Sequence, residues 1–237
     1  MPPDSPLPDA RPPLLMRAAP SPDQPLAGLT VLAVEDSRFA CEALRLLCNR
    51  LGARLRRAET LAAAAAHLRT YRPDVVLVDL GLPDGPGTAL IASLAALGPS
   101  RPLVMGMSGE EGARARAVAA GAAGYLDKPL ESLAGFRDLL LSHLPDRGWL
   151  GSAPETPGQR LPPPDPLAMR DDLARAAAWL AQGGDDTRYV AGFVAGLARA
   201  TRDTALERAA RGPPAALGSL LHARLHSLSA TPAFGRA

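Results

Sequence analysis

The sequence predicts an α/β fold in which a parallel β-sheet is doubly wound by helices on both faces, followed by a small all-α domain. Five short apolar segments alternate with five segments of helical periodicity before a proline-rich stretch. The apolar segments are hydrophobic almost throughout rather than at every second position, as in LTVLAV (29–34) and DVVLV (74–78). Such strands are typical of parallel sheets, because helices cover both faces and leave neither to water.

The elements follow one another in a regular order. The first helix, over 38–52, begins after Ser37 as its N-cap and ends at Gly52 as its C-cap. Residues 53–58 form a weaker strand that we place toward an edge of the sheet. The other elements are expected as helix 60–71, strand 74–78, helix 87–97, strand 102–107, helix 110–121, strand 123–126 and helix 131–144.

Proline-rich segments divide the chain. Residues 1–27 are rich in proline and alanine and lack the long apolar segment of a secretory signal, so we expect a disordered tail. The sheet domain then occupies residues 28–145 and a proline-rich linker residues 146–166.

The last part of the chain, residues 167–230, has a different pattern and is called the helical module below. It is expected to form three or four amphipathic helices. One helical face combines Leu173, Ala177 and Leu180, and another combines Tyr189, Phe193 and Leu197. We interpret it as a partner-binding or dimerisation module.

Composition excludes several classes of protein. The net charge is +2, so no strong attraction to nucleic acid or to an anionic membrane is expected. No apolar run reaches the roughly 18 residues of a membrane-spanning helix. Cys41 and Cys48 have too few partners for a zinc site or a disulfide framework. We therefore expect them to be small buried hydrophobes, and the protein to be cytoplasmic.

Polar side chains follow several of the expected strands, at the points where these strands end. They are Glu35 and Asp36 after the first strand, Asp79 after the third, Ser108 after the fourth, and Asp127 and Lys128 after the fifth. The carboxyl ends of parallel strands meet at one edge of the sheet, where ligands bind. Several acids at one place repel unless a cation joins them, and oxygen ligands with room for water suit Mg²⁺. The sequence therefore predicts a magnesium site at this edge.

Lys128 is the only lysine among 26 lysines and arginines, and Pro129 follows it directly. A compact ammonium on a flexible stem can point at a phosphoryl oxygen, whereas the planar fork of arginine needs a wider approach. If one carboxylate becomes an acyl phosphate, the site must accept a dianion in place of a monoanion. A divalent metal, the ammonium and a hydroxyl opposite it would stabilise that dianion. The proline disfavours helical geometry at Lys128 and keeps the lysine extended.

Residues 28–145 resemble the receiver domain of two-component response regulators, of the chemotaxis-regulator-like type. The resemblance depends on five features in order, which are Glu35-Asp36, Asp79 in VDLGLPDGPG, Ser108 in MSG, Tyr125, and Lys128-Pro129. It implies a flavodoxin-like fold with the strand order 2-1-3-4-5. It does not extend to the helical module.

The resemblance also implies the chemistry of the site. Asp79 would accept a phosphoryl group from a histidine kinase or a histidine phosphotransfer protein. Ser108 and Lys128 would contact that group. Tyr125 would be an aromatic switch that turns inward as Ser108 is drawn to the phosphate, so that a local change of charge biases a two-state surface.

The same resemblance implies how Mg²⁺ would be held. Asp36, Asp79 and the main-chain carbonyl of Gly81 would be its ligands, with Glu35 acting through a bridging water. The protein would then be a phosphoacceptor rather than an enzyme, apart from its self-phosphorylation and self-dephosphorylation.

The departures from the family pattern are modest. The first acid, Glu35, is a variant that the family tolerates, and Ser108 stands where threonine is commoner. Gly109 stands where alanine is frequent, so we expect a looser loop. Gly81 offers no side chain to shield an acyl phosphate from water. We therefore expect a short-lived phosphorylated state unless Glu110 or a neighbour blocks the water.

Alternatives remain open for the output. The sheet domain could be a scaffold that is never phosphorylated, although Asp79, Ser108 and Lys128 are all present. The helical module could bind DNA as an atypical output domain, although it has no clear basic recognition helix. It could also be a phosphotransfer module through His222 or His226. An enzymatic output is excluded, because about 60 residues cannot bury the core that such a domain needs. We expect instead a downstream protein partner or a homodimer.

Overall fold

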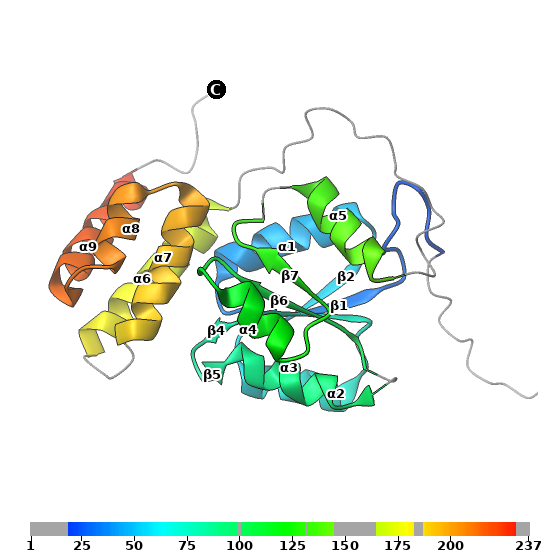
Figure 1. Cartoon of the computed structure of the whole chain (residues 1–237). Helices are drawn as coiled ribbons and strands as arrows, with labels where there is room; N and C mark the ends of the chain where they lie inside the picture. The colour runs from blue at the N-terminus through cyan, green and yellow to red at the C-terminus, as the bar shows by residue number, and fades with distance from the viewer. Residues whose placement is uncertain (1–18, 99–100, 131, 145–164, 183–186, 231–237) are drawn as a thin grey trace, which may run out of the picture.

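The fold is a five-stranded parallel sheet with helices on both faces, joined by a bundle of helices at one end (Figure 1). The computed structural model describes residues 19–98, 101–130, 132–144, 165–182 and 187–230. The strand order is β2-β1-β3-β6-β7, which confirms the predicted order. The strands are β1 (Thr30–Val34), β2 (Arg54–Ala58), β3 (Val75–Asp79), β6 (Leu103–Ser108) and β7 (Gly124–Asp127), and β2 lies at an edge as expected.

Two apolar layers explain why the central strands are hydrophobic throughout. In β3, Val75 and Leu77 belong to one core cluster, whereas Val76 and Val78 belong to the other. The first cluster is completed by α1 (Arg38–Arg50) and α5 (Leu133–Ser142). The second is completed by α2 (Leu61–Thr70), α3 (Gly87–Ala95) and α4 (Ala113–Ala119). Alternate side chains of one strand therefore bury apolar surface on opposite faces of the sheet.

Local signals set the beginnings of two helices near the carboxyl edge of the sheet. Ser37 is the N-cap of α1, as expected, and its hydroxyl accepts a hydrogen bond from the Ala40 amide at 3.0 Å. A short hairpin of β4 (Gly81–Leu82) and β5 (Gly85–Pro86) precedes α3 and was not predicted. A Cβ at Gly87 would lie 1.9 Å from the Asp79 carbonyl oxygen. Glycine therefore allows α3 to begin directly against the end of β3.

The folded unit begins earlier than the sequence predicts. Residues 1–27 are expected to be a disordered tail, yet Leu26 and Ala27 are buried in the described structure. The amide of Leu26 donates to the carbonyl of Leu51 at 2.9 Å, and Leu26 packs in the same cluster as α1. An apolar pair at the end of a proline-rich segment thus covers the end of α1. Residues 1–18 lie outside the described residues.

The helical module contains α6 (Pro166–Gln182), α7 (Thr187–Thr201), α8 (Thr204–Ala210) and α9 (Pro214–Ala230). The additional helices after the sheet domain are therefore present. Their common core includes Leu173, Val194, Leu206 and Leu221, all of which are buried. Most of the expected linker, residues 146–164, lies outside the described residues, and α6 begins at its last position.

The helical module is packed against the carboxyl edge of the sheet. Phe39, at the start of α1, belongs to the core cluster of the module. Helix α6 contacts α1, and α7 contacts β4 (Figure 1). Two helices that come late in the sequence therefore lie over the edge at which the strands end.

Other expectations concern single features of the chain. Cys41 and Cys48 are free and buried, and burial raises the pKa of the Cys48 thiol to about 12. They behave as small hydrophobes.

Among the residues that the structure describes, none of the helices combines the length and the hydrophobicity that crossing a membrane requires.

The buried position of Leu26 leads to a test of where the folded unit begins in the sequence. We expect Leu26→Ala to lower the free energy of unfolding by about 2–5 kcal/mol, because the cavity would lie in the core beneath α1. Chemical denaturation would measure the change. The control is Leu167→Ala, because Leu167 is 60% exposed and its truncation should cost about 0.5 kcal/mol or less. Equal effects of the two substitutions would mean that residues 19–27 add nothing to the core.

Candidate functional site

Three carboxylates meet at the carboxyl edge of the sheet. Glu35 and Asp36 follow β1, and Asp79 is the last residue of the neighbouring strand β3. One oxygen from each lies within 4.8 Å of the others, and all three residues are buried. The predicted convergence of these acids is therefore present in the structure.

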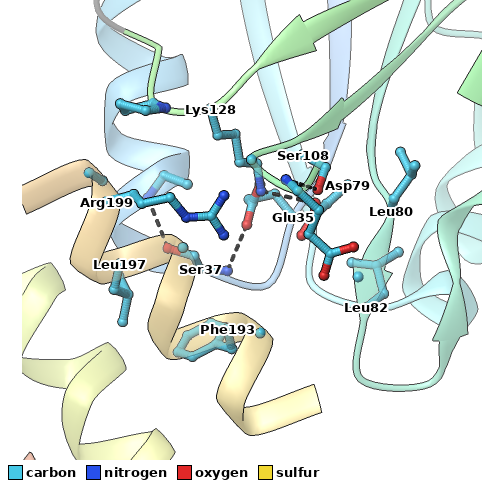
Figure 2. Close-up of a pocket in the computed structure, with 18 of the residues that line it drawn as sticks. Glu35, Ser37, Asp79, Leu80, Leu82, Ser108, Lys128, Phe193, Leu197 and Arg199 are labelled. Carbon is cyan, nitrogen blue, oxygen red and sulfur yellow. Dashed lines mark hydrogen bonds and ion pairs between the residues drawn. The ribbon is translucent and has the colours of Figure 1, made fainter. Parts of the chain in front are cut away.

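The single lysine joins the carboxylates. Its Nζ lies 2.5 Å from Oε2 of Glu35 and 3.1 Å from Oδ1 of Asp79 (Figure 2). The backbone amide of Lys128 donates to the Ser108 carbonyl at 3.0 Å, which fixes the residue where β7 ends beside β6. The only lysine of the sequence therefore lies beside the aspartate that the resemblance marks as phosphoacceptor.

Ser108 is the last residue of β6, which lies beside β3, and Tyr125 lies on β7, the edge strand beside β6. The serine hydroxyl accepts a hydrogen bond from the Glu110 amide at 3.1 Å. The Tyr125 hydroxyl donates to the Ser108 carbonyl at 2.8 Å, and the tyrosine is buried. Tyr125 thus points inward and contacts the residue to which its expected switching is coupled.

Burial and like charges shift the pKa values of the acids. Burial raises the pKa of Glu35 to about 8, although the neighbouring Lys128 lowers it and the other carboxylates raise it further. Burial likewise raises the pKa of Asp36 to about 6. Burial opposes the charge of Lys128, but Asp79 and Glu35 together raise its pKa above the ordinary value. The lysine therefore stays charged while two of the acids hold protons more tightly than usual.

The donor set fits a hard divalent cation. When all three carboxylates are ionised, the one ammonium leaves two negative charges in a small buried volume. Among the described groups, Oε2 of Glu35 has no hydrogen bond of ordinary geometry, although the ammonium is close. Oxygen ligands of this kind suit Mg²⁺. Gly81 lies two residues beyond Asp79 on the wall of the same cavity, with nothing within 4 Å of a Cβ built on it.

A cavity of about 950 Å³ lies between Glu35 and Asp79 on one side and part of α7 on the other. Asp79, Ser108 and Lys128 line it from the sheet domain (Figure 2). Phe193 and Arg199 line it from α7. The site is therefore a partly open cavity between two parts of the chain rather than a bare sheet edge.

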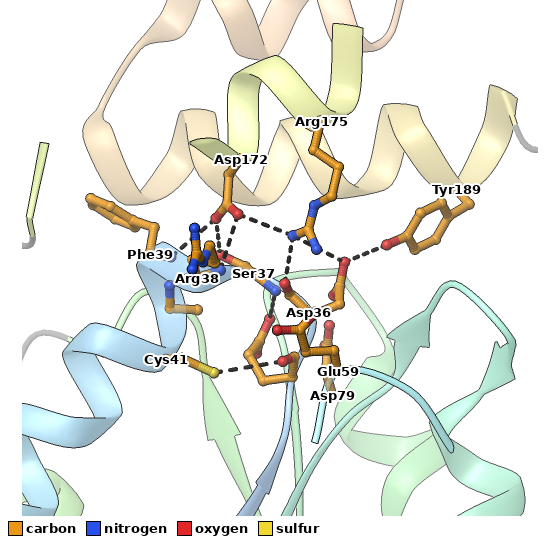
Figure 3. Close-up of polar contacts among 12 residues, drawn as sticks. Asp36, Ser37, Arg38, Phe39, Cys41, Glu59, Asp79, Asp172, Arg175 and Tyr189 are labelled. Atoms are coloured by element: carbon orange, nitrogen blue, oxygen red, sulfur yellow. Dashed lines mark hydrogen bonds and ion pairs between the residues drawn. The ribbon is translucent and has the colours of Figure 1, made fainter. Parts of the chain in front are cut away.

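The sequence did not predict that the helical module contacts the acids directly. The hydroxyl of Tyr189, on α7, donates to Oδ2 of Asp36 (Figure 3). A guanidinium nitrogen of Arg175, on α6, donates to the main-chain carbonyl of Asp36 and lies 3.9 Å from its Oδ2. An expected metal ligand is thus held by two side chains of the module.

Asp172 on α6 attaches the module to the beginning of α1. It is fully buried, and it accepts hydrogen bonds from the Ser37 hydroxyl at 2.8 Å and from the amides of Arg38 at 3.1 Å and Phe39 at 3.0 Å (Figure 3). Arg175 pairs with it at 3.0 Å. A carboxylate at a helix N-terminus satisfies free amides and is favoured by the helix dipole. This contact lies directly beside Asp36.

The sequence contains a signal for the contact of Asp172 with α1. Asp172 lies four residues from Ala168 and from Ala176, on a helical face that is otherwise apolar and buried. An acid on such a face needs a polar partner, because an unpaired buried charge is costly. That signal shows that a partner is required but does not identify it.

Known proteins resemble the sheet domain. Residues 31–135 match the family model of the response regulator receiver domain. The KDP operon transcriptional regulatory protein KdpE of Escherichia coli is 37% identical over 99 residues, which cover 42% of this chain and 44% of that protein. Protein-glutamate methylesterase/protein-glutamine glutaminase 2 of Anaeromyxobacter dehalogenans is 45% identical over 67 residues, 28% of this chain and 20% of that protein.

A solved structure is also similar to part of this chain. The response regulator receiver domain (CheY-like) of Methylobacillus flagellatus is 29% identical with a TM-score of 0.44, and the match covers 48% of this chain and 97% of that domain. The chain spans less than half the length of the two curated relatives. The family model ends at residue 135, before the helical module begins.

The raised pKa values predict how metal binding depends on pH. Protons compete with a cation for Glu35 and Asp36, whose pKa values are about 8 and about 6. We therefore expect the Mg²⁺ affinity to rise as the pH is raised from about 6 to about 8. Calorimetric titration in buffers of different ionisation enthalpy would measure both the affinity and the protons released. A pH-independent affinity without proton release would contradict these shifts.

A second prediction concerns the attachment of the module. Asp172→Ala removes a buried acceptor and leaves amides of α1 unpaired, which should cost about 1–3 kcal/mol. Hydrogen exchange should become faster at Arg38 and Phe39. The matched control is Asp171→Ala, because Asp171 is half exposed and its ion pair with Arg38 should contribute about 0–1 kcal/mol. Equal exchange in the two variants would show that Asp172 does not hold α1 to α6.

Proposed function

We propose, from the premise that residues 31–135 are a response regulator receiver domain, that Asp79 accepts a phosphoryl group from a histidine kinase or a histidine phosphotransfer protein. The observation that carries the proposal is the position of the Asp79 carboxylate. It lies 3.1 Å from the single lysine and borders a cavity large enough for a phosphoryl group. The side chain of Asp79 is 11% exposed and faces this cavity.

The phosphoryl transfer would exchange a P–N bond of the donor for a P–O bond to Asp79. A carboxylate oxygen of Asp79 attacks the phosphorus of a phosphohistidine, so that a P–O bond forms while the P–N bond breaks. The imidazole leaves with the electron pair of that bond and takes up a proton. The product is an acyl phosphate, which adds negative charge where two other carboxylates are already buried.

The neighbouring residues would stabilise that added charge. Lys128 would donate to a phosphoryl oxygen, and the Ser108 hydroxyl would donate to another, because both line the cavity beside Asp79. Asp36, Asp79 and the Gly81 carbonyl would hold Mg²⁺, with Glu35 acting through water. When bound, the cation would offset part of the charge on the phosphoryl group and bring it in line with the acceptor. Electrostatic positioning of this kind is the main protein contribution in phosphoryl transfer.

Hydrolysis would end the phosphorylated state. Gly81 has no side chain above Asp79, and Glu110 is directed to Arg116 in an ion pair of 2.7 Å. Neither of these two residues shields the acceptor, so the lifetime of the acyl phosphate would depend on how far α7, which lines the other side of the cavity, admits water.

The signal would pass to protein contacts of the helical module. Movement of Ser108 toward the phosphoryl group would displace Tyr125, because the Tyr125 hydroxyl donates a hydrogen bond to the Ser108 carbonyl. An unidentified downstream protein or a second copy of the chain would then read the changed surface. A non-phosphorylated scaffold is the competing proposal for the sheet domain.

DNA binding is a second candidate for the output, favoured by the name of the transcriptional regulatory relative. A mobility shift with random duplex DNA at moderate salt tests it, because nonspecific binding is largely electrostatic. The proposal that Asp79 is phosphorylated does not depend on the result of this DNA-binding test.

Phosphorylation itself has a direct test. Incubation with acetyl phosphate and Mg²⁺ should add the mass of one phosphoryl group to the protein, and Asp79→Asn should abolish the addition. Lys128→Arg should reduce it by roughly tenfold or more, because a planar guanidinium cannot take the position of a compact ammonium. Intact-protein mass spectrometry measures both. An unmodified wild-type protein would favour the scaffold, and normal modification of Lys128→Arg would show that the lysine is not needed.

A further inference from the structure

Helix α7 lies along the mouth of the proposed phosphorylation site. Tyr189, near its beginning, contacts Asp36, and Arg199, ten residues later, lines the cavity beside Ser108 and Lys128. Ten residues of α-helix span about 15 Å, so one helix can reach both ends of the site. Figure 2 shows Arg199 extending from α7 toward Lys128 and Glu35.

Gly109 is the residue that makes room for this arginine. A Cβ built on Gly109 would lie 2.5 Å from Nη1 and 3.1 Å from Cζ of Arg199. Any larger side chain would therefore displace the guanidinium. The looser loop expected from the sequence is thus accompanied by a specific contact, in which the arginine occupies the space of the missing methyl group.

The charge of Arg199 lacks an anionic partner. Its Nε donates to the Ala195 carbonyl at 3.1 Å within α7. Among the described residues, no carboxylate lies within ion-pair distance of its guanidinium. The side chain is partly buried at the cavity wall. A partly desolvated guanidinium that points into a cavity is well suited to an incoming anion.

We propose that Arg199 is a second phosphoryl-binding cation, supplied to the receiver site by the helical module, and that Gly109 admits it. The inference rests on the proposed phosphorylation of Asp79. Lys128 is already shared between Glu35 and Asp79 before transfer, so it cannot alone neutralise the dianion that replaces the Asp79 carboxylate. The planar fork of an arginine can bind two phosphoryl oxygens at once. Phosphorylation would then tighten α7 against the site, and the module would sense the phosphoryl group directly.

Trifluoroberyllate, a stable mimic of the phosphoryl group, tests this role in the full-length chain. In the presence of Mg²⁺, we expect Arg199→Ala to weaken its binding by roughly tenfold or more, equivalent to about 1.4 kcal/mol. Arg199→Lys should restore part of the affinity. The matched control is Arg208→Ala, because Arg208 is exposed on α8 and does not line the cavity. Calorimetry measures the affinity and fluorine NMR identifies the bound anion.

Gly109→Ala separates a direct contact from a general effect on the fold. In the wild-type background it should weaken trifluoroberyllate binding, because the added methyl group displaces the guanidinium. In the Arg199→Ala background the same change should have a much smaller effect, so that the two substitutions are not additive. Additive effects would overturn the assignment of Gly109.

The outcomes distinguish this inference from the proposed function. If acetyl phosphate modifies Asp79 and the wild type binds trifluoroberyllate, but Arg199→Ala binds it equally well, only the role of Arg199 is wrong. If the wild type neither binds the mimic nor becomes phosphorylated, both proposals are wrong. A loss of affinity in Arg208→Ala as large as in Arg199→Ala would also overturn the inference, because the effect would then come from net charge.

Discussion

Mutual repulsion among Glu35, Asp36 and Asp79 is the constraint on which the site depends. Their oxygens lie within 4.8 Å of one another, and Lys128 supplies one positive charge against three negative ones. Burial strengthens the repulsion and raises the pKa values of Glu35 and Asp36. Such a cluster is stable with a divalent cation or with bound protons. The same imbalance makes the site sensitive to the arrival of a further anion.

The helical module is part of that balance. Tyr189 donates to Asp36, and Arg175 lies near the same carboxylate. Asp172 accepts a hydrogen bond from the start of α1, the helix that begins two residues after Asp36. Asp36 is therefore in contact with two helices of the module, α6 and α7.

The sequence predicted much of the sheet domain but little of the attachment. Continuous apolar strands such as 74–78 indicate a parallel sheet, and a parallel sheet brings its strand ends together. Those two steps were enough to place Asp79 near Lys128. The contacts of Asp172 and Tyr189 join residues more than 130 positions apart. Helical periodicity reports which face of a helix is buried, but it carries no information about the surface that covers it.

A crystal structure of the full chain with Mg²⁺ and trifluoroberyllate would test this view of the site most directly. We expect the metal to contact both Asp36 and Asp79, the mimic to lie on the Asp79 carboxylate, and Lys128 and Arg199 to contact its fluorine atoms. A mimic bound away from Asp79, or Lys128 still paired with Glu35 while α7 has left the site, would contradict it.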